Sequence, residues 1–223
     1  MRKQQQGFTL IEIAIVLVII GLLLGGVLKG QELIQNARVR NVIAQQDGIK
    51  AAFFGFQDRY RGIPGDYKKD LANQNIPGAS TVCGGNGDSL INTTDESICA
   101  WYHLSKANFI TGNYSGTGTG ADANNSPANP FGGVMQVIYD DKYSDATTAT
   151  SVHNIKTGIN IPASILAEVD RKLDDGLPSS GSFRFSTFGN ATAANCIVAG
   201  TATTPDTWSI ASGATVCGGA SLF

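Results

Sequence analysis

The sequence is poor in charge and in histidine. Asp, Glu, Lys and Arg make up 15% of its 223 residues, the formal net charge is -2, and no long basic run occurs. Because proteins neutralise nucleic-acid phosphates with clustered Lys and Arg, nucleic-acid binding is not expected as the main activity. The only histidines, His103 and His153, lack Cys, Glu or Asp neighbours at the spacing of a catalytic triad or metal site. We therefore expect neither an enzyme nor a bound cofactor.

Cysteine is scarce and occurs in no C-x-x-C pair. The four cysteines, Cys83, Cys99, Cys196 and Cys217, lie in polar stretches rich in Gly and Ser. Such a set is typical of two disulfides formed in an oxidising compartment rather than of a zinc site. Four cysteines allow three connectivities. The two sequence clusters favour local pairs, Cys83 with Cys99 and Cys196 with Cys217.

One long apolar run stands out, at residues 8–28, and only Thr9 and Glu12 interrupt it. As a helix, a run of this length extends about 31 Å and can cross a bilayer. Arg2 and Lys3 precede it, so the positive-inside tendency places this end in the cytoplasm and the remainder outside. A cleaved secretory signal fits less well, because the run is long and no small-x-small cleavage site follows it.

Proline is absent before Pro64, so the helix is predicted to continue beyond the apolar run. Six apolar residues downstream follow spacings of 3, 7, 4, 3 and 4, which aligns them on one helical stripe. They are Val39, Val42, Ile49, Phe53, Phe56 and Tyr60. Gly62 and Pro64 supply a stop. The sequence thus predicts a helix over 8–61, apolar all round in its first half and striped in its second, followed by a globular domain over 62–223.

A carboxylate, Glu12, lies inside the apolar run. Acidic side chains in membrane segments are energetically costly and usually have a compensating partner. One interpretation is an edge charge that reaches the headgroups, since Glu12 is about one helical turn from the end of the run. The other is a specific pair with a cation.

Gly21 and Gly25 form a G-x-x-x-G pattern, and Gly26 and Gly30 form a second. This spacing permits close helix packing. The same glycines are also consistent with a place where the helix loosens.

The globular domain is predicted to be α+β. Helices are expected in "ESICAWYHLSKANFITG" (96–112), with His103 on its surface, and in "PASILAEVDRKLDDG" (162–176), capped by Gly176. Strands are expected at 134–139, 151–161, 181–188 and 206–212, with His153 in a strand or its turn. Residues 113–133 form a low-complexity loop whose "GTGTG" is a poor match to a nucleotide-binding loop. An antiparallel sheet packed on the helical stripe satisfies this pattern.

Three acidic residues, Asp170, Asp174 and Asp175, end the second predicted helix. They are candidate calcium ligands, because calcium takes several oxygen ligands. The alternative, a solvated helix end without metal, is the interpretation that the sequence favours.

The amino terminus resembles a known family. A basic leader ending in Gly7, then "FTLIE" and an unbroken apolar run, is similar to the prepilin signature of type IV pilins and type II secretion pseudopilins. The resemblance implies cleavage by a prepilin peptidase between Gly7 and Phe8, removal of leader 1–7, and N-methylation of Phe8. It also implies that Glu12 pairs with the Phe8 amine of a neighbouring copy in a helical filament.

The resemblance further implies a location and partners. Before assembly, the chain would lie in the bacterial inner membrane with a periplasmic head, where the assembly machinery acts on it. Afterwards it would join other copies in an extracellular or periplasmic filament. Many major pilins carry a proline near the end of the apolar segment, and this chain has none there. A pilus subunit is therefore the prediction, a secretion pseudopilin is the alternative, and a membrane-tethered adhesive domain is the alternative from another class.

Overall fold

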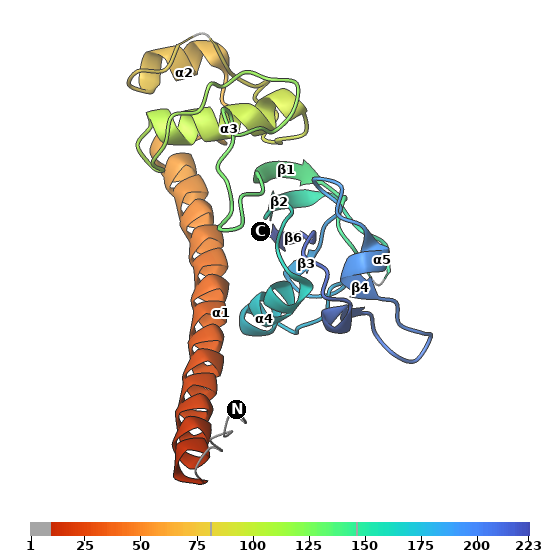
Figure 1. Ribbon diagram of the computed structural model, residues 1–223. Coiled ribbons are helices and arrows are strands. Elements are labelled where there is room, and N and C mark those ends of the chain that lie inside the picture. The colour runs from red at the N-terminus through yellow and green to blue at the C-terminus, as the bar shows by residue number, and fades with distance from the viewer. Residues whose placement is uncertain (1–9, 81, 146) are drawn as a thin grey trace, which may run out of the picture. The chain divides into compact units, whose positions relative to one another are not determined.

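The computed structural model describes residues 10–80, 82–145 and 147–223 (Figure 1). By its internal contacts the chain divides into two units, with the boundary between Arg38 and Val39. A single helix, α1 (Leu10–Tyr60), belongs to both units. The unit that begins at Val39 contains the globular domain.

The other helices and strands all lie in this second unit. The helices are α2 (Lys69–Asn75), α3 (Thr94–Lys106), α4 (Ala163–Leu173), α5 (Ala193–Cys196) and the short 3-10 helix η1 (Ile210–Ser212). The strands are β1 (Gln136–Asp140), β2 (Val152–Lys156), β3 (Phe183–Phe185), β4 (Ile197–Val198), β5 (Thr207–Trp208) and β6 (Gly219–Leu222).

The predicted stripe of α1 is buried. Its members from Val39 to Phe56 are at most 6% exposed, and Tyr60 at the end of the helix is partly buried. The helix ends at Tyr60, and Arg61 follows in the left-handed conformation with φ 55°. A left-handed residue cannot continue a right-handed helix, so the chain turns here, close to the predicted stop.

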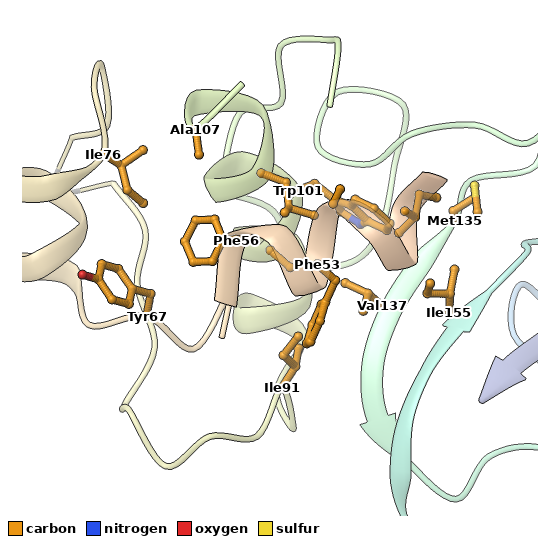
Figure 2. Close-up of a cluster of buried hydrophobic side chains, with 14 of the residues drawn as sticks. Phe53, Phe56, Tyr67, Ile76, Ile91, Trp101, Ala107, Met135, Val137 and Ile155 are labelled. Atoms are coloured by element: carbon orange, nitrogen blue, oxygen red, sulfur yellow. The ribbon is translucent and has the colours of Figure 1, made fainter. Parts of the chain in front are cut away.

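Four strands form one antiparallel sheet in the order β1-β2-β6-β3. Val137 of β1 pairs with Ile155 of β2, and both side chains are buried against Phe53 and Phe56 of α1. Trp101 of α3 completes this cluster, as Figure 2 shows. The predicted α+β class, with a long apolar helix packed against an antiparallel sheet, is confirmed.

A second core cluster lies against the start of the buried stripe. Val39 and Val42 of α1 pack with Leu166 and Val169 of α4, and with aromatic side chains from β3 and β5. α1 therefore contributes to the two larger core clusters of the globular domain, which makes its second half an integral part of the head.

The strand predicted at 206–212 is present only in part, and it is not the last strand of the chain. Only Thr207–Trp208 is extended there, in a small sheet with β4, and η1 follows. The carboxyl-terminal strand of the main sheet is β6, whose sequence "GASL" has low β-propensity. Small residues are needed there because a Cβ at Gly219 would collide with the Phe183 ring. Packing, rather than propensity, selects this strand.

Several boundaries of helices and strands also differ from the predictions, and one helix was not predicted. α3 begins at Thr94, because Thr93 and Glu96 form a capping box, and it ends at Lys106, before Gly112. α4 ends at Leu173 and is capped by Asp174 rather than by Gly176. The second predicted strand stops at Lys156. Helix α2 was not predicted, since its polar sequence "KDLANQN" lacks an apolar face.

Candidate functional site

The first half of α1 exposes its aliphatic side chains. In the described chain this helix is long and apolar enough to cross a membrane, and its most apolar 18-residue window has a mean hydropathy of 2.8 with no buried residue. Side-chain exposure runs from 46% at Ile20 to 92% at Leu10. Glu12 lies in the first turn, where the helix dipole favours a negative charge. The predicted cleavage and methylation residues, Gly7 and Phe8, lie outside the described residues.

The four glycines of this segment have no steric role within the described chain. A Cβ built at Gly21, Gly25, Gly26 or Gly30 would meet no heavy atom within 4 Å beyond its own helix backbone and neighbours. Glycine is unfavourable inside a helix, and here no side chain of the described residues takes advantage of the space. Their role in helix packing remains a prediction about contacts with other molecules.

A family model described as the prokaryotic N-terminal methylation motif matches residues 2–28. The chain carries this motif. The methylation motif is the signature of type IV pilins and pseudopilins, as the residues around Gly7 and Glu12 predicted. Proteins with the motif are typically structural rather than catalytic, and the motif implies prepilin-peptidase processing and membrane anchoring before pilin assembly. No curated protein and no solved structure matches the chain.

Two disulfides stabilise the part of the chain that does not contain the motif. Cys83 is bonded to Cys99, with 5.5 Å between their Cα atoms, and Cys196 to Cys217, with 5.6 Å. These are the local pairs that the two sequence clusters favour. The first ties a loop to α3 and the second ties α5 to the segment before β6. Both restrain Gly-rich loops with little apolar content of their own.

The three candidate calcium ligands are close together. One carboxylate oxygen from each of Asp170, Asp174 and Asp175 lies within 4.8 Å of the others. Asp170 is fully buried, so the predicted solvated helix end is wrong for this residue, whereas Asp175 is exposed. Asp170 lies in the last turn of α4, and Asp174 is the residue that caps this helix.

Protein donors bind several of these carboxylate oxygens, but no donor among the described residues reaches the buried Oδ1 of Asp170. Trp208 donates its indole N–H to Asp170 at 2.6 Å, and Asp174 accepts N–H bonds from Ser182 and Phe183. Burial raises the pKa of Asp170 to about 8, and its hydrogen bond with Asp174 adds to the rise. The bond from Trp208 ties Asp170 of α4 to β5, and the bonds from Ser182 and Phe183 to Asp174 hold the turn that leads into β3.

The two histidines are structural. His103 was predicted on a helix surface, which is wrong, because it is fully buried and stacks on Phe56 with 6.1 Å between ring centroids. Its Nδ1 accepts the Gly65 N–H at 3.0 Å, so it is held against the turn that follows α1. Burial lowers the pKa of His103 to about 4. His153 lies in β2 as predicted, and burial also lowers its pKa.

One organising residue was missed from the sequence. Asp66 is 2% exposed and accepts the N–H groups of Gly87 and Ser89, each at 2.7 Å. It therefore holds the loop after Cys83 against the turn that follows α1. Its partners lie more than twenty residues away, so no local pattern could have identified it.

Proposed function

We propose that the chain is a structural subunit of a type IV pilus-like filament that assembles through its amino-terminal helix. The observation that carries the proposal is the methylation motif at residues 2–28, which includes the first part of α1. The first half of α1 exposes a continuous aliphatic surface that lipid covers before assembly and neighbouring copies cover afterwards. The second half holds the head.

In this proposal a prepilin peptidase removes residues 1–7, and Phe8 becomes the methylated amino terminus of the mature chain. The helix over 8–61 then carries a filament core segment at 8–28, and residues 62–223 form the head. The head is periplasmic while the subunit waits in the inner membrane. The paired disulfides support this location, because such bonds persist in oxidising compartments.

Glu12 has the central role in assembly. The new amine at Phe8 of one copy pairs with the Glu12 carboxylate of its neighbour. An uncompensated charge among apolar helices is strongly unfavourable, so this pair selects the correct axial register.

Mass spectrometry of the native protein tests the processing step. We expect a mature chain that begins at Phe8, without the first seven residues and with one added methyl group. A chain that begins at Met1, or one cut beyond Leu28, would contradict the proposal.

Shearing of intact cells separates a filament from a membrane-tethered monomer. We expect the processed subunit in sheared fibres if it belongs to a surface pilus. Recovery of the processed chain solely as a membrane-bound monomer would support the tethered binding domain instead.

A further inference from the structure

Asp170 has a buried carboxylate oxygen without a hydrogen-bond partner among the described residues. The residue is fully buried, and its Oδ2 accepts the indole N–H of Trp208 at 2.6 Å. Its Oδ1 is also buried, and no donor of the described chain reaches it. Because a buried polar atom without a partner is energetically costly, this oxygen requires a partner such as a proton or an ion.

The unsatisfied oxygen belongs to a group of three carboxylates. One oxygen from each of Asp170, Asp174 and Asp175 lies within 4.8 Å of the other two. Since Trp208 holds Oδ2, Oδ1 is the oxygen of Asp170 that is left to face the other acids. Burial raises the pKa of Asp170 to about 8, and the neighbouring carboxylates add to the rise. Ionised carboxylates this close repel one another unless a positive charge lies between them.

Hydrogen bonds already orient the two outer carboxylates. Asp174 accepts the N–H of Phe183 at 3.0 Å. Asp175 accepts the N–H of Leu177 at 2.9 Å and the hydroxyl of Ser180 at 2.6 Å. A carboxylate oxygen has more than one lone pair, so it can keep such a bond and still coordinate an ion. The group is therefore held in place before an ion binds.

The available ligand atoms are carboxylate oxygens. All four cysteines are in disulfides, and His103 and His153 pack against aromatic rings of α1. Oxygen ligands suit calcium or magnesium rather than zinc or copper. Magnesium demands a nearly ideal octahedron, whereas calcium accepts irregular sets of about six to eight oxygens. Asp175 is exposed, so water can complete the coordination of calcium from that side.

The charges around the group favour a divalent ion. Lys50 of α1 interacts electrostatically with Asp174, and it interacts with Asp47 as well. Arg171 is paired with Glu168. When all three carboxylates are ionised, the Lys50 ammonium therefore offsets at most one of their negative charges.

We propose that Asp170, Asp174 and Asp175 form a calcium site at the carboxyl end of α4. Oδ1 of Asp170 is the buried ligand, and the two outer acids and water complete the coordination. Through Trp208 the site also fixes β5, so one ion would hold together α4, β5 and the turn that leads into β3. The inference concerns the head alone and does not depend on the proposed filament function.

The first test measures stability in the full detergent-solubilised chain after treatment with a chelator. Adding about 1 mM calcium should raise the midpoint of thermal unfolding by about 5 °C or more, because the ion binds the folded chain only. The same concentration of magnesium should give a clearly smaller rise. No rise with calcium, or an equal rise with magnesium, would overturn the calcium site.

Three variants locate the site. Asp170→Asn keeps an oxygen for Trp208 and can donate an N–H toward Asp174, so it imitates a protonated acid and the head should fold without responding to calcium. Asp175→Asn changes an exposed side chain, and its response should require at least tenfold more calcium. The matched control, Glu168→Gln, removes a carboxylate of α4 outside the group and should respond as the wild type does. A wild-type response in both aspartate variants would overturn the site.

Terbium luminescence provides a second measurement. Terbium binds calcium sites and emits when a nearby tryptophan transfers excitation energy to it, and Trp208 contacts Asp170 directly. Calcium should displace the signal. Trp208→Phe should remove most of it, and Trp101→Phe should leave it, since Trp101 lies in the other core cluster. A signal that survives Trp208→Phe and Asp170→Asn would place the ion elsewhere and contradict the proposal.

Discussion

The two halves of α1 have the same backbone structure but different surroundings. In the first half no residue of the most apolar window is buried, and Leu22 is 73% exposed. In the second half Phe53 and Phe56 are 3% and 0% exposed beneath α3 and the sheet. Helical hydrogen bonds satisfy the backbone in both. Within the described residues only the second half is covered, and an apolar helix surface like that of the first half is typical of a segment surrounded by lipid or by other helices.

This comparison accounts for the residue patterns. A helix surrounded by lipid or by other helices is apolar on every side, as in residues 13–28. A helix that packs on one domain needs a single stripe, and its other faces carry polar residues such as Asp47 and Asp58. One continuous helix thus joins a segment that is apolar on every side to a segment that packs on its own domain through a single stripe.

Glu12→Gln should have the largest effect, and only on the first half. Export, leader cleavage and folding of the head should be unchanged, because the neutral side chain enters a membrane at least as easily. The amount of sheared filament should fall at least tenfold, since the buried amine of a neighbouring copy would lose its counter-charge. The free-energy difference that favours the correct axial register over a shifted one would then fall by several kcal/mol. The measurement is sheared filament from cells that contain equal amounts of processed subunit. Normal filament number would show that Glu12 instead reaches the headgroups.

Phe56→Ala should act only on the second half. We expect a loss of about 3–5 kcal/mol in the free energy of unfolding, because a fully buried ring is replaced by a cavity. Urea unfolding of the detergent-solubilised chain, followed by Trp101 and Trp208 fluorescence, measures it.

The matched control is Phe54→Ala, two residues earlier, where the ring is 51% exposed. The free energy of unfolding of Phe54→Ala should differ from that of the wild type by no more than about 1 kcal/mol. Equal losses from the two variants would contradict the assignment of the buried stripe.

Acid should weaken the second half through His103. The folded pKa of about 4 lies below the ordinary value of 6.5, so below pH 6.5 the unfolded chain binds a proton that the folded chain does not. The contribution of neutral His103 to the free energy of unfolding is fully present above pH 6.5. About 3 kcal/mol of it is lost as the pH falls toward 4. His103→Gln should remove that part of the pH dependence in the same urea experiment. An unchanged pH profile would show that His103 is not held neutral by the core.

The smallest expected effect compares two glycines of the second half. Gly48→Ala should stabilise the subunit by about 1 kcal/mol, because alanine is the better helix former and its Cβ has free space. Gly55→Ala should show no such gain, since the Phe109 ring must move. Thermal unfolding of the two variants in detergent measures the difference, and equal gains would mean that the ring adjusts without penalty.

Features governed by local periodicity were predictable from the sequence. The stripe from Val39 to Phe56, the stop near Gly62 and the strands at Val137 and Phe183 follow from spacing and turn residues. The methylation motif was likewise recognisable, because it is a contiguous signature at residues 2–28. Even the local disulfide pairs could be favoured from their sequence separation.

By itself, the sequence determined that one long helix joins an all-apolar segment to a striped one and that an α+β head follows. Only the tertiary structure decided that "GASL" forms a central strand, that His103 is buried, and that Trp208 donates to Asp170. These features depend on residues brought together from distant parts of the chain. The room left by Gly219 for the Phe183 ring and the desolvation of His103 arise only after the head has packed.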